Sequence, residues 1–301
     1  MKKYDFVLLT DSRYVHPKDI NTYIRSILDE DLLVIKALEN KGMSVIRVDW
    51  ADENFDWSSA KTAIFRTTWD YFDRFDEFIS WINNTKSQLS FINSVELILW
   101  NIDKHYMQDL AAQGVNIPET RFIESGEQIS LNEILSATGW NDAILKPAIS
   151  ASARHTYRIN PGNCSKLESV YQSLIQTEAM LLQPFQNSVL ERGEIALMFF
   201  EGKYSHAILK TAKKGDFRVQ SEFGGTVQDH IPTQAEITLG EQVLQACNSM
   251  PVYARVDIIE DNNGILAVAE LELIEPELWF RYTPEAAESF ADAVIKYLST
   301  I

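Results

Sequence analysis

The stretch that most constrains the fold runs from Pro251 to Glu277 and has the pattern of two strands joined by a turn. Val252 to Ile259 and Ile265 to Leu273 both alternate apolar and polar residues, as half-buried strands do. The segment between them, Glu260 to Gly264, is rich in residue types that tolerate the positive φ angles of a turn. The pattern therefore predicts a β-hairpin against which the rest of the chain packs.

Three carboxylates are expected to converge on this hairpin, because side chains alternate between the two faces of a strand. Arg255 and Asp257 share a face of the first strand, and Glu270 and Glu272 share a face of the second. Two carboxylates ~4 Å apart repel by roughly 4 kcal/mol at an effective dielectric of about 20, so a cation is needed to offset them. An all-oxygen cluster suits Mg²⁺, which usually binds through one or two carboxylates plus substrate phosphates.

The alternative for this hairpin is a solvated polar face without a ligand. Apolar residues surround Glu270 and Glu272 in the second strand, from Ala267 to Ile274, and they favour a strand in the centre of its sheet. A buried strand that carries two carboxylates is better explained by a metal and phosphate site than by solvation. Asp257, Glu270 and Glu272 are therefore the predicted metal ligands.

Composition limits the class of protein. Of the 301 residues, 46% are hydrophobic, which is enough for packed cores, and the formal net charge is −16. This charge argues against a nucleic acid or an anionic membrane as partner, since both are bound mainly through excess Lys and Arg. Cys164 and Cys247 have no disulfide or zinc spacing, and we expect no leader or membrane span, so the predicted location is the cytoplasm.

The first ninety or so residues predict a small parallel-sheet α/β unit, because short apolar strands alternate with helical patterns. The strands are expected at 5–10, 44–50 and 63–66, and the helices after Asp31 and at 75–82. The segment Arg66-Thr67-Thr68-Trp69-Asp70-Tyr71 then lies at the carboxyl end of a strand, where such folds bind ligands. Arg66 could hold a substrate carboxylate, Asp70 an ammonium group, and Trp69 could form an apolar wall. The alternative is a local Arg66–Asp70 pair with no role in binding.

Two lysines are candidate phosphate ligands. Lys104 is expected in the first turn of a helix that ends before Gly114, where its charge opposes the helix dipole and suggests another use. Lys146 ends a predicted strand at 143–145 and precedes a loop of small residues that includes Ser150 and Ser152. Small side chains let backbone N–H groups approach phosphate oxygens, although this loop lacks the usual glycine. For a lone lysine, a surface position is the alternative.

The remaining pattern predicts a second sheet, which contains an antiparallel hairpin at 195–209 and is covered by the helices at 233–246 and 284–298. Strands are expected at 116–123, 180–185, 195–200 and 204–209, and helices at 165–177, 233–246 and 284–298. A basic segment that contains Lys210 and Arg218 follows the last of these strands, and a solvated loop is its alternative interpretation. Its charge complements the acidic hairpin, as a nucleotide triphosphate with metal would require.

The two lysines, the basic segment and the acidic hairpin follow one another along the chain in an order that resembles the ATP-grasp superfamily. ARVD at Ala254 to Asp257 is similar to the motif of D-alanine–D-alanine ligases, and the spacing of Lys210, Arg218 and Gly224-Gly225 is similar to that of bacterial glutathione synthetases. The chain most resembles O-ureido-D-serine cyclo-ligases, in the segments RTTWDY, LWNIDKHYM, KPAISASARHT, ALMFFEGKYSHAILK and YARVD to ELELIEPELW. These segments span Arg66 to Trp279.

The resemblance implies an α/β protein of the ATP-grasp type, with a domain at 1–95, a small lobe at 96–180 and a large lobe at 181–301. It implies ATP and Mg²⁺ as cofactors. The implied roles are nucleotide binding by Lys104, Lys146, Ser150, Ser152, Gln183, Phe185, Glu191 and Glu194, metal binding by Asp257, Glu270 and Glu272, and phosphoryl stabilisation by Lys210, Arg218 and Arg255. Phe185 is expected to offer backbone hydrogen bonds to adenine, and Glu191 or Glu194 to reach the ribose.

The function that follows is ATP-dependent ligation of a small amino-acid-like or peptide carboxylate to an amine, through an acyl phosphate, giving an amide or a cyclised product. Three features differ from glutathione synthetases: the loop after Lys146 lacks glycines, Glu272 replaces an amide, and Lys210 replaces an arginine and so removes its bidentate fork. A small-molecule kinase and a non-catalytic nucleotide-binding protein are the alternatives, and a homodimer is left open.

Overall fold

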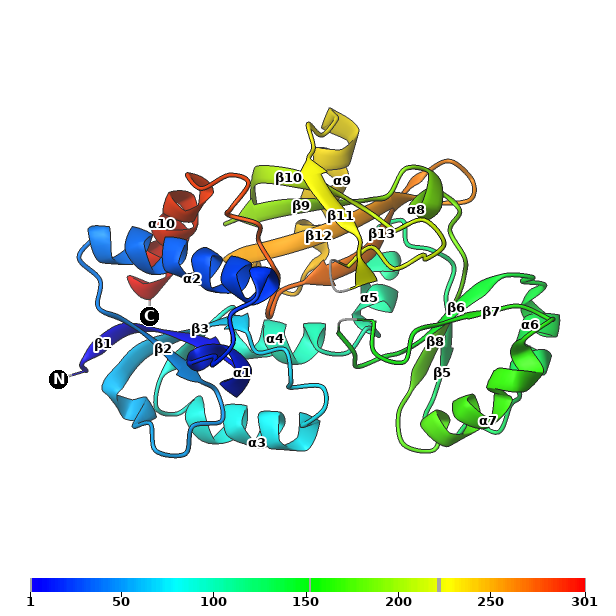
Figure 1. Cartoon of the computed structure of the whole chain (residues 1–301), viewed down its shortest axis with the longest axis horizontal. Helices are drawn as coiled ribbons and strands as arrows, with labels where there is room; N and C mark the ends of the chain where they lie inside the picture. The colour runs from blue at the N-terminus through cyan, green and yellow to red at the C-terminus, as the bar shows by residue number, and fades with distance from the viewer. Residues whose placement is uncertain (1, 152, 221–222, 301) are drawn as a thin grey trace.

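The computed structural model describes residues 2–151, 153–220 and 223–300, and these form three sheets with helices packed on them. Figure 1 shows the N-terminal sheet at one end of the molecule, a second sheet with its two helices at the other end, and the third sheet between and above them. The architecture is mixed α/β, as predicted, and it has one parallel and two antiparallel sheets. No helix among these residues combines the length and the apolar character needed to cross a membrane.

The N-terminal sheet is parallel and has the strand order β2-β1-β3-β4. Its strands are β1 (Tyr4–Thr10), β2 (Val45–Asp49), β3 (Ala60–Thr67) and β4 (Ser90–Ile92), and its helices are α1 (Ser12–Val15), α2 (Thr22–Asn40), η1 (Trp57–Ser59) and α3 (Phe75–Thr85). The predicted alternation of strands and helices is confirmed. The pattern did not predict β4, a three-residue strand that pairs with β3.

The helix expected after Asp31 begins much earlier. Asn21 caps α2 by accepting a hydrogen bond from the backbone N–H of Ile24, so Glu30 and Asp31 lie inside the helix instead of before it. Both acidic residues are buried, which the sequence reading missed because it took them for a polar helix start. Two buried carboxylates on one helix require cationic partners from elsewhere in the fold.

The second sheet is antiparallel and has the order β5-β8-β6-β7. It consists of β5 (Arg121–Ile123), β6 (Ala143–Pro147), β7 (Tyr157–Ile159) and β8 (Met180–Pro184), and α6 (Leu131–Thr138) and α7 (Cys164–Ile175) pack on it. The sequence predicted neither α6 nor β7. A capping box between Ser130 and Glu133 starts α6. The domain boundary predicted after residue 180 falls inside β8, which pairs with β5 and β6.

The third sheet is antiparallel, with the order β11-β10-β9-β12-β13. Its elements are α8 (Ser188–Glu191), β9 (Glu194–Phe200), β10 (Lys203–Thr211), β11 (Thr226–Asp229), α9 (Gln234–Ala246), β12 (Tyr253–Glu260), β13 (Leu266–Glu272) and α10 (Ala286–Leu298). One face packs on α9, and the other packs on α10, which also contacts α2 of the N-terminal unit. The predicted hairpin is β12 and β13.

The strand β13 lies at the edge of its sheet, so the prediction of a central strand is wrong. Two short helices, α4 (Val95–Asn101) and α5 (Tyr106–Ala112), cover this edge. Asn101 donates to the carbonyl of Leu271 at 2.9 Å and accepts from the N–H of Leu273 at 2.8 Å, and the Tyr106 hydroxyl accepts from the N–H of Leu271 at 2.9 Å. The strand is apolar because side chains, instead of another strand, satisfy and cover its edge.

Candidate active site

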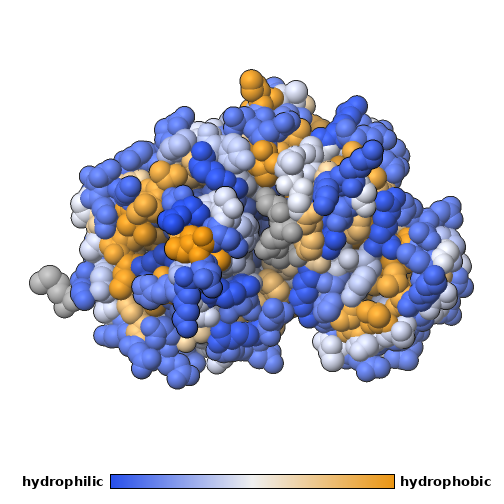
Figure 2. Space-filling view, in the orientation of Figure 1, coloured by the Kyte–Doolittle hydropathy of each residue, from blue (hydrophilic) through white to orange (hydrophobic). Residues whose placement is uncertain are grey.

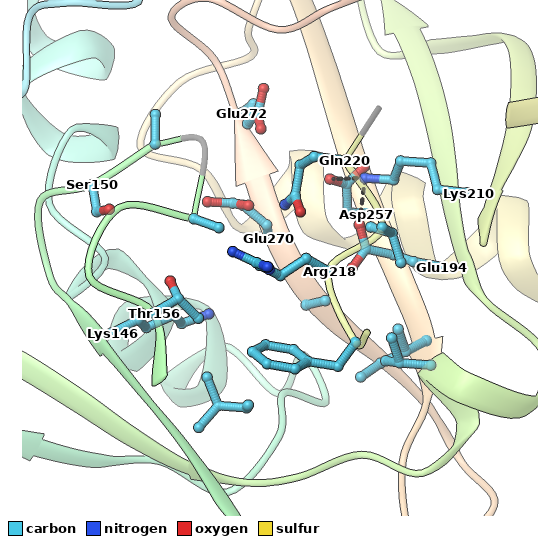
Figure 3. A pocket seen from close by; sticks show the side chains of 18 of the residues that line it. Lys146, Ser150, Thr156, Glu194, Lys210, Arg218, Gln220, Asp257, Glu270 and Glu272 are labelled. Atoms are coloured by element: carbon cyan, nitrogen blue, oxygen red, sulfur yellow. Dashed lines mark hydrogen bonds and ion pairs between the residues drawn. The ribbon is translucent and has the colours of Figure 1, made fainter. Parts of the chain in front are cut away.

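A pocket of about 260 Å³ lies where the three sheets meet. Figure 2 shows the surface hollowed near the middle of this face, and Figure 3 shows the side chains that surround the pocket. Most of the predicted site residues line it: Trp69, Lys104, Lys146, Ser150, Gln183, Phe185, Glu194, Lys210, Arg218, Arg255, Asp257, Glu270 and Glu272. Residues that are far apart in the sequence therefore meet in one cavity.

The three acidic residues of the hairpin come together as the alternation predicts. In the antiparallel register, Asp257 lies opposite Glu270, and Arg255 lies opposite Glu272. Carboxylate oxygens of Asp257, Glu270 and Glu272 lie within 4.8 Å of one another. An all-oxygen donor set of this size fits a hard divalent cation such as Mg²⁺.

Cations of the protein already offset the repulsion between these carboxylates. Lys210 Nζ lies 2.8 Å from Asp257 Oδ2 and also pairs with Glu194. Arg255 donates to both oxygens of Asp257 at 2.9 Å and pairs with Glu272. Burial acts to raise the pKa of Asp257, but Arg255 and Lys210 outweigh it and hold this pKa below its ordinary value. Repulsion between the carboxylates is therefore no longer a reason to expect a metal ion. The metal site is supported instead by the arrangement of the carboxylate oxygens.

Two lysines face Glu270 from the other side of the pocket. Lys104 Nζ lies 3.3 Å from Glu270 Oε1 and donates to the carbonyl of Ser150. It lies in the connection between α4 and α5, so its predicted position in the first turn of a helix is wrong. Burial lowers the pKa of Lys146, which lies on β6, while Glu270 acts in the opposite direction. Burial acts to raise the pKa of Glu270, but Lys104 and Lys146 hold it below its ordinary value.

The loop after Lys146 takes its shape without glycine. Ala153 and His155 adopt positive φ angles of 54° and 49°, a conformation that glycine adopts more readily. Ser150 Oγ donates to the carbonyl of Arg154 at 3.1 Å, and the N–H of Lys104 donates to the carbonyl of Ala148 at 3.0 Å. Ser152, the other predicted serine, lies outside the described residues. The loop is thus hydrogen-bonded to Lys104, one of the two lysines that line the pocket.

The geometry corrects the expected adenine contacts. The N–H of Phe185 donates to Asp142 O at 2.9 Å and is therefore already used, and its carbonyl already accepts one hydrogen bond, from Asn262 Nδ2 at 2.8 Å. Gln183 lines the pocket while its Nε2 donates to Thr120 Oγ1 at 2.9 Å. The Phe185 side chain can still provide an apolar wall.

Glu191 and Glu194 differ in position. Glu191 is exposed at the end of α8 and is not among the described residues that line the pocket, so the structure does not support contact of Glu191 with a ribose there. Glu194 lines the pocket at the start of β9 and pairs with Lys210. Arg218 also lines it, held by Asp216 at 2.7 Å, and points toward the interior in Figure 3.

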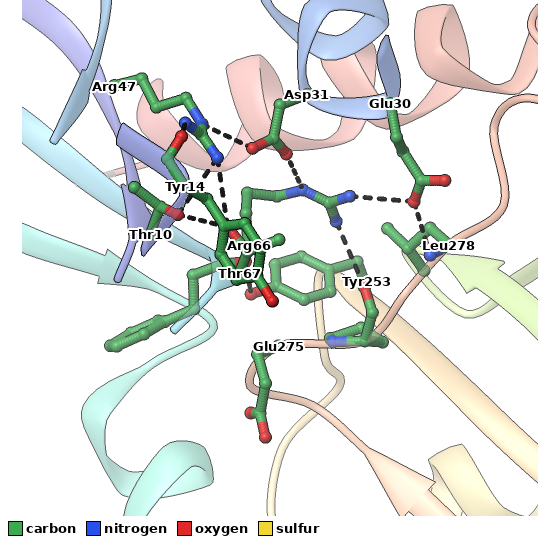
Figure 4. Close-up of polar contacts among 12 residues, drawn as sticks. Thr10, Tyr14, Glu30, Asp31, Arg47, Arg66, Thr67, Tyr253, Glu275 and Leu278 are labelled. Carbon is green, nitrogen blue, oxygen red and sulfur yellow. Dashed lines mark hydrogen bonds and ion pairs between the residues drawn. The ribbon is translucent and has the colours of Figure 1, made fainter. Parts of the chain in front are cut away.

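Arg66 does not reach the large pocket, because it is only 2% exposed and its guanidinium is held by buried partners. Figure 4 shows these partners, which are the two carboxylates of α2 and a backbone carbonyl. Arg66 lies 3.2 Å from Glu30, 3.3 Å from Asp31 and 3.4 Å from the carbonyl of Pro276. The structure therefore supports neither the substrate contact nor the local pair with Asp70 that the sequence offered.

The side chains of the other two residues of the predicted substrate site, Trp69 and Asp70, have different surroundings. Trp69 lines the pocket and donates from Nε1 to the carbonyl of Glu275 at 3.1 Å. Asp70 points away, accepting from Trp50 Nε1 at 2.7 Å and pairing with Arg74 at 3.0 Å. Of the three, only Trp69 is positioned to touch a ligand in this cavity.

The buried carboxylate of Glu30 predicts a pH dependence of stability. Burial and the charge of Glu277 raise the pKa of Glu30 to about 7, although Arg66 and Arg281 oppose the shift. The folded protein then binds more protons than the unfolded chain between about pH 4.5 and pH 7, so the free energy of unfolding falls as the pH rises through this window. In Glu30→Gln this contribution is absent, and we expect a shallower fall.

Urea unfolding of the wild-type protein and Glu30→Gln at about pH 5, 6 and 7 measures this difference. The pKa of the buried Glu275 carboxyl is also raised to about 7, but Glu275 is present in both proteins, so its contribution cancels in the comparison. Parallel pH curves for the two proteins would show that Glu30 does not titrate in the folded state.

Several pocket residues were missed by the sequence reading. The segment after β13 contributes Glu275, Glu277 and Trp279, and Trp279 has a positive φ of 47°. Its ring lies 5.0 Å from the guanidinium of Arg255, so it covers one of the predicted catalytic cations. The only signal was the acidic and aromatic run that continues beyond the end of the alternating pattern. Alternation stops at the strand end and does not predict where the next side chains point.

This chain is similar in sequence and in fold to known proteins. Residues 6–93 match the model of the N-terminal domain of D-cycloserine synthetase DcsG. The cycloserine biosynthesis protein DcsG of Streptomyces lavendulae is 28% identical over 276 residues, which cover 88% of this chain and 92% of that protein. The crystal structure of D-cycloserine synthetase DcsG superposes with a TM-score of 0.86 at 26% identity, over 97% of this chain and 99% of the other. The chain is homologous to D-cycloserine synthetase, an ATP-grasp ligase.

More distant ATP-grasp ligases share the same fold. The D-alanine–D-alanine ligase B of Clostridium perfringens is 24% identical over 199 residues, covering 64% of this chain and 63% of that protein. The D-alanine–D-alanine ligase of Bacillus anthracis, in a complex with ATP, has a TM-score of 0.67 at 14% identity, over 99% of this chain and 98% of that one. The resemblance stated from the sequence is confirmed: the chain is homologous to DcsG, and its structural neighbours are ATP-grasp ligases, which form carbon–nitrogen bonds.

Proposed function

We propose that this ligase uses ATP to convert a small amino-acid-like or peptide carboxylate into an acyl phosphate, which a nitrogen nucleophile then attacks. The product is an amide or, when nucleophile and carboxylate belong to one molecule, a ring. The observation that carries the proposal is the convergence of three carboxylates and several cations in one pocket of an ATP-grasp ligase. This arrangement can hold a polyphosphate and stabilise the transfer of its terminal phosphoryl group.

The proposed nucleotide site uses both walls of the pocket. Lys104 and Lys146 hold phosphate oxygens, and their present partner is the carboxylate of Glu270. The adenine ring lies against apolar side chains near β6, β8 and α8, among them Ile144, Phe185 and Val189. Glu194 is proposed for the ribose. These contacts position the nucleotide, and positioning with charge stabilisation is most of what phosphoryl transfer requires.

The proposed metal site is Asp257, Glu270 and Glu272, whose oxygens fit the requirements of Mg²⁺. When bound, Mg²⁺ neutralises charge on phosphate oxygens. Lys210, Arg218 and Arg255 then stabilise the charge of the transferring phosphoryl group. No side chain of the protein needs to form a covalent bond, because the substrate carboxylate attacks the γ-phosphorus itself.

Product analysis tests this function. The wild-type protein is incubated with ATP, Mg²⁺ and a panel of carboxylates that includes O-ureido-D-serine and D-alanine, with ADP release as the first readout. We expect ADP and phosphate together with an amide or ring, and loss of the reaction when a chelator removes Mg²⁺. A stable phosphate ester would instead identify a kinase, and ATP binding without turnover would identify a nucleotide-binding protein.

A further inference from the structure

One carboxylate of the pocket differs from the others in its partners. Among the residues that the structure describes, six acidic ones line the cavity: Glu194, Asp257, Glu270, Glu272, Glu275 and Glu277. Five of them pair with a lysine or an arginine. Lys210 pairs with Glu194 and Asp257, and Arg255 pairs with Asp257 and Glu272. Lys104 pairs with Glu270, and Arg281 pairs with Glu277. Within residues 2–151, 153–220 and 223–300, no lysine or arginine forms an ion pair with Glu275. Its charge is therefore available to a bound molecule.

The N-terminal unit fixes Glu275 at this position. Trp69 Nε1 donates to the carbonyl of Glu275, and the Arg66 guanidinium donates to the carbonyl of Pro276. Figure 4 shows the carboxylate of Glu275 pointing away from the buried cluster around Arg66. Two of the residues predicted from sequence to bind substrate thus hold the backbone at Glu275 and at the residue that follows it.

The surroundings of Glu275 suit a group that exchanges a proton near neutral pH. It is only 7% exposed, and burial raises its pKa to about 7, while a hydrogen bond from the Tyr71 hydroxyl lowers it. The charged groups that face it have opposite effects, since Lys104 lowers this pKa and Glu270 raises it. Glu272 and the Tyr71 and Tyr253 hydroxyls also lie within its electrostatic reach. A base is most effective when its pKa lies near the working pH.

We propose that Glu275 is the catalytic base that accepts the proton lost by the nitrogen nucleophile during attack on the acyl phosphate. In this step the nitrogen–carbon bond forms, the bond from the acyl carbon to the phosphate oxygen breaks, and phosphate leaves with the electron pair. The proton of the nitrogen moves to a carboxylate oxygen of Glu275. The inference rests on the proposed function, because it requires the acyl phosphate, but it assigns the second half of the reaction to a separate residue.

Trapping with hydroxylamine separates the two halves. Hydroxylamine is unprotonated at neutral pH and captures an acyl phosphate as a hydroxamate without help from a base. With O-ureido-D-serine or D-alanine as the carboxylate, we expect Glu275→Gln to form hydroxamate within about twofold of the wild-type rate. Its formation of the normal amide or ring should fall about a hundredfold, which is within the range for loss of a general base.

Glu53→Gln is the matched control, since it makes the same chemical change at an exposed turn residue outside the pocket. It should retain both rates. Equal losses of hydroxamate and product in Glu275→Gln would overturn the proposal, because the residue would then act on folding or on carboxylate activation. Wild-type product formation in Glu275→Gln would overturn it as well. If the wild-type protein gave no hydroxamate with either carboxylate, the proposed function itself would fall.

Tyr71→Phe gives a second readout that a purely structural role would not move. Removal of the hydroxyl removes a hydrogen bond that lowers the pKa of Glu275, so this pKa should rise. The acidic limb of the pH profile for product formation should then shift to higher pH, while the rate of hydroxamate formation stays unchanged. An unshifted limb in a folded Tyr71→Phe variant would contradict the assignment of that limb to Glu275.

Discussion

Replacement of Glu270 by glutamine is expected to lower kcat by at least about a thousandfold without unfolding the protein. Glu270 lies opposite Asp257 in the hairpin, is one of three carboxylates whose oxygens lie within 4.8 Å of one another, and faces Lys104 and Lys146. Glutamine preserves the shape but removes the charge. The predicted metal site then loses a ligand charge, and the two lysines proposed to bind phosphate lose the anion that they face.

The measurement is kcat at saturating ATP and Mg²⁺, with calorimetry of Mg²⁺-dependent ATP binding alongside. Glu260→Gln is the control. Glu260 is the last residue of β12, next to the turn of the hairpin, and it pairs with the exposed Arg192 outside the pocket. Unchanged kcat in Glu270→Gln would remove Glu270 from the catalytic machinery. From sequence alone, the substitution would stabilise the protein by relieving repulsion. The structure predicts no such gain, because Lys104 and Lys146 keep the pKa of Glu270 below its ordinary value.

The hairpin was the most predictable part of the site. Its register follows from strict alternation, which places Asp257 and Glu270 on the same face whatever else the chain does. A bulge between Asp257 and Ile258 shifts the pairing beyond that point without separating the carboxylates. Local periodicity is therefore enough to predict which side chains of a hairpin can meet.

The neighbours of that hairpin were less predictable. An apolar strand has the same sequence whether another strand or a pair of helices covers it, so β13 was taken as central when it is an edge. The residues that cover it, Asn101 and Tyr106, act through hydrogen bonds to its backbone, which carries no sequence information. The position of Lys104 between two short helices was missed for a similar reason, because the helical pattern continues across the break.

The partners of Arg66 could not be read from local sequence either. The nearest acid along the chain, Asp70, pairs instead with Arg74, while Arg66 pairs with residues that lie 35 and 36 positions earlier. Those residues looked like a polar helix start. Glu30 and Asp31 are buried because α2 packs against α10 and against the segment after β13. Local sequence does not show this packing.

Replacement of Arg66 by methionine is expected to lower the free energy of unfolding by about 3–5 kcal/mol. The guanidinium pairs with Glu30 and Asp31 in the interior and donates to the carbonyl of Pro276. Methionine fills much of the space but leaves Glu30 with less compensation for its buried charge. Asp31 keeps Arg47 at 2.6 Å, so Glu30, with Arg281 at 3.1 Å, carries most of the cost.

Urea unfolding measures the loss, and two variants show its origin. Arg74→Met removes a partly exposed arginine that pairs with Asp70 and Glu77, and it should cost no more than about 1 kcal/mol. Arg66→Met combined with Glu30→Gln should be more stable than Arg66→Met alone, because the second change removes the carboxylate left with less compensation. An Arg66→Met protein with wild-type stability and a raised KM for the carboxylate would contradict the buried network and restore Arg66 as a substrate ligand.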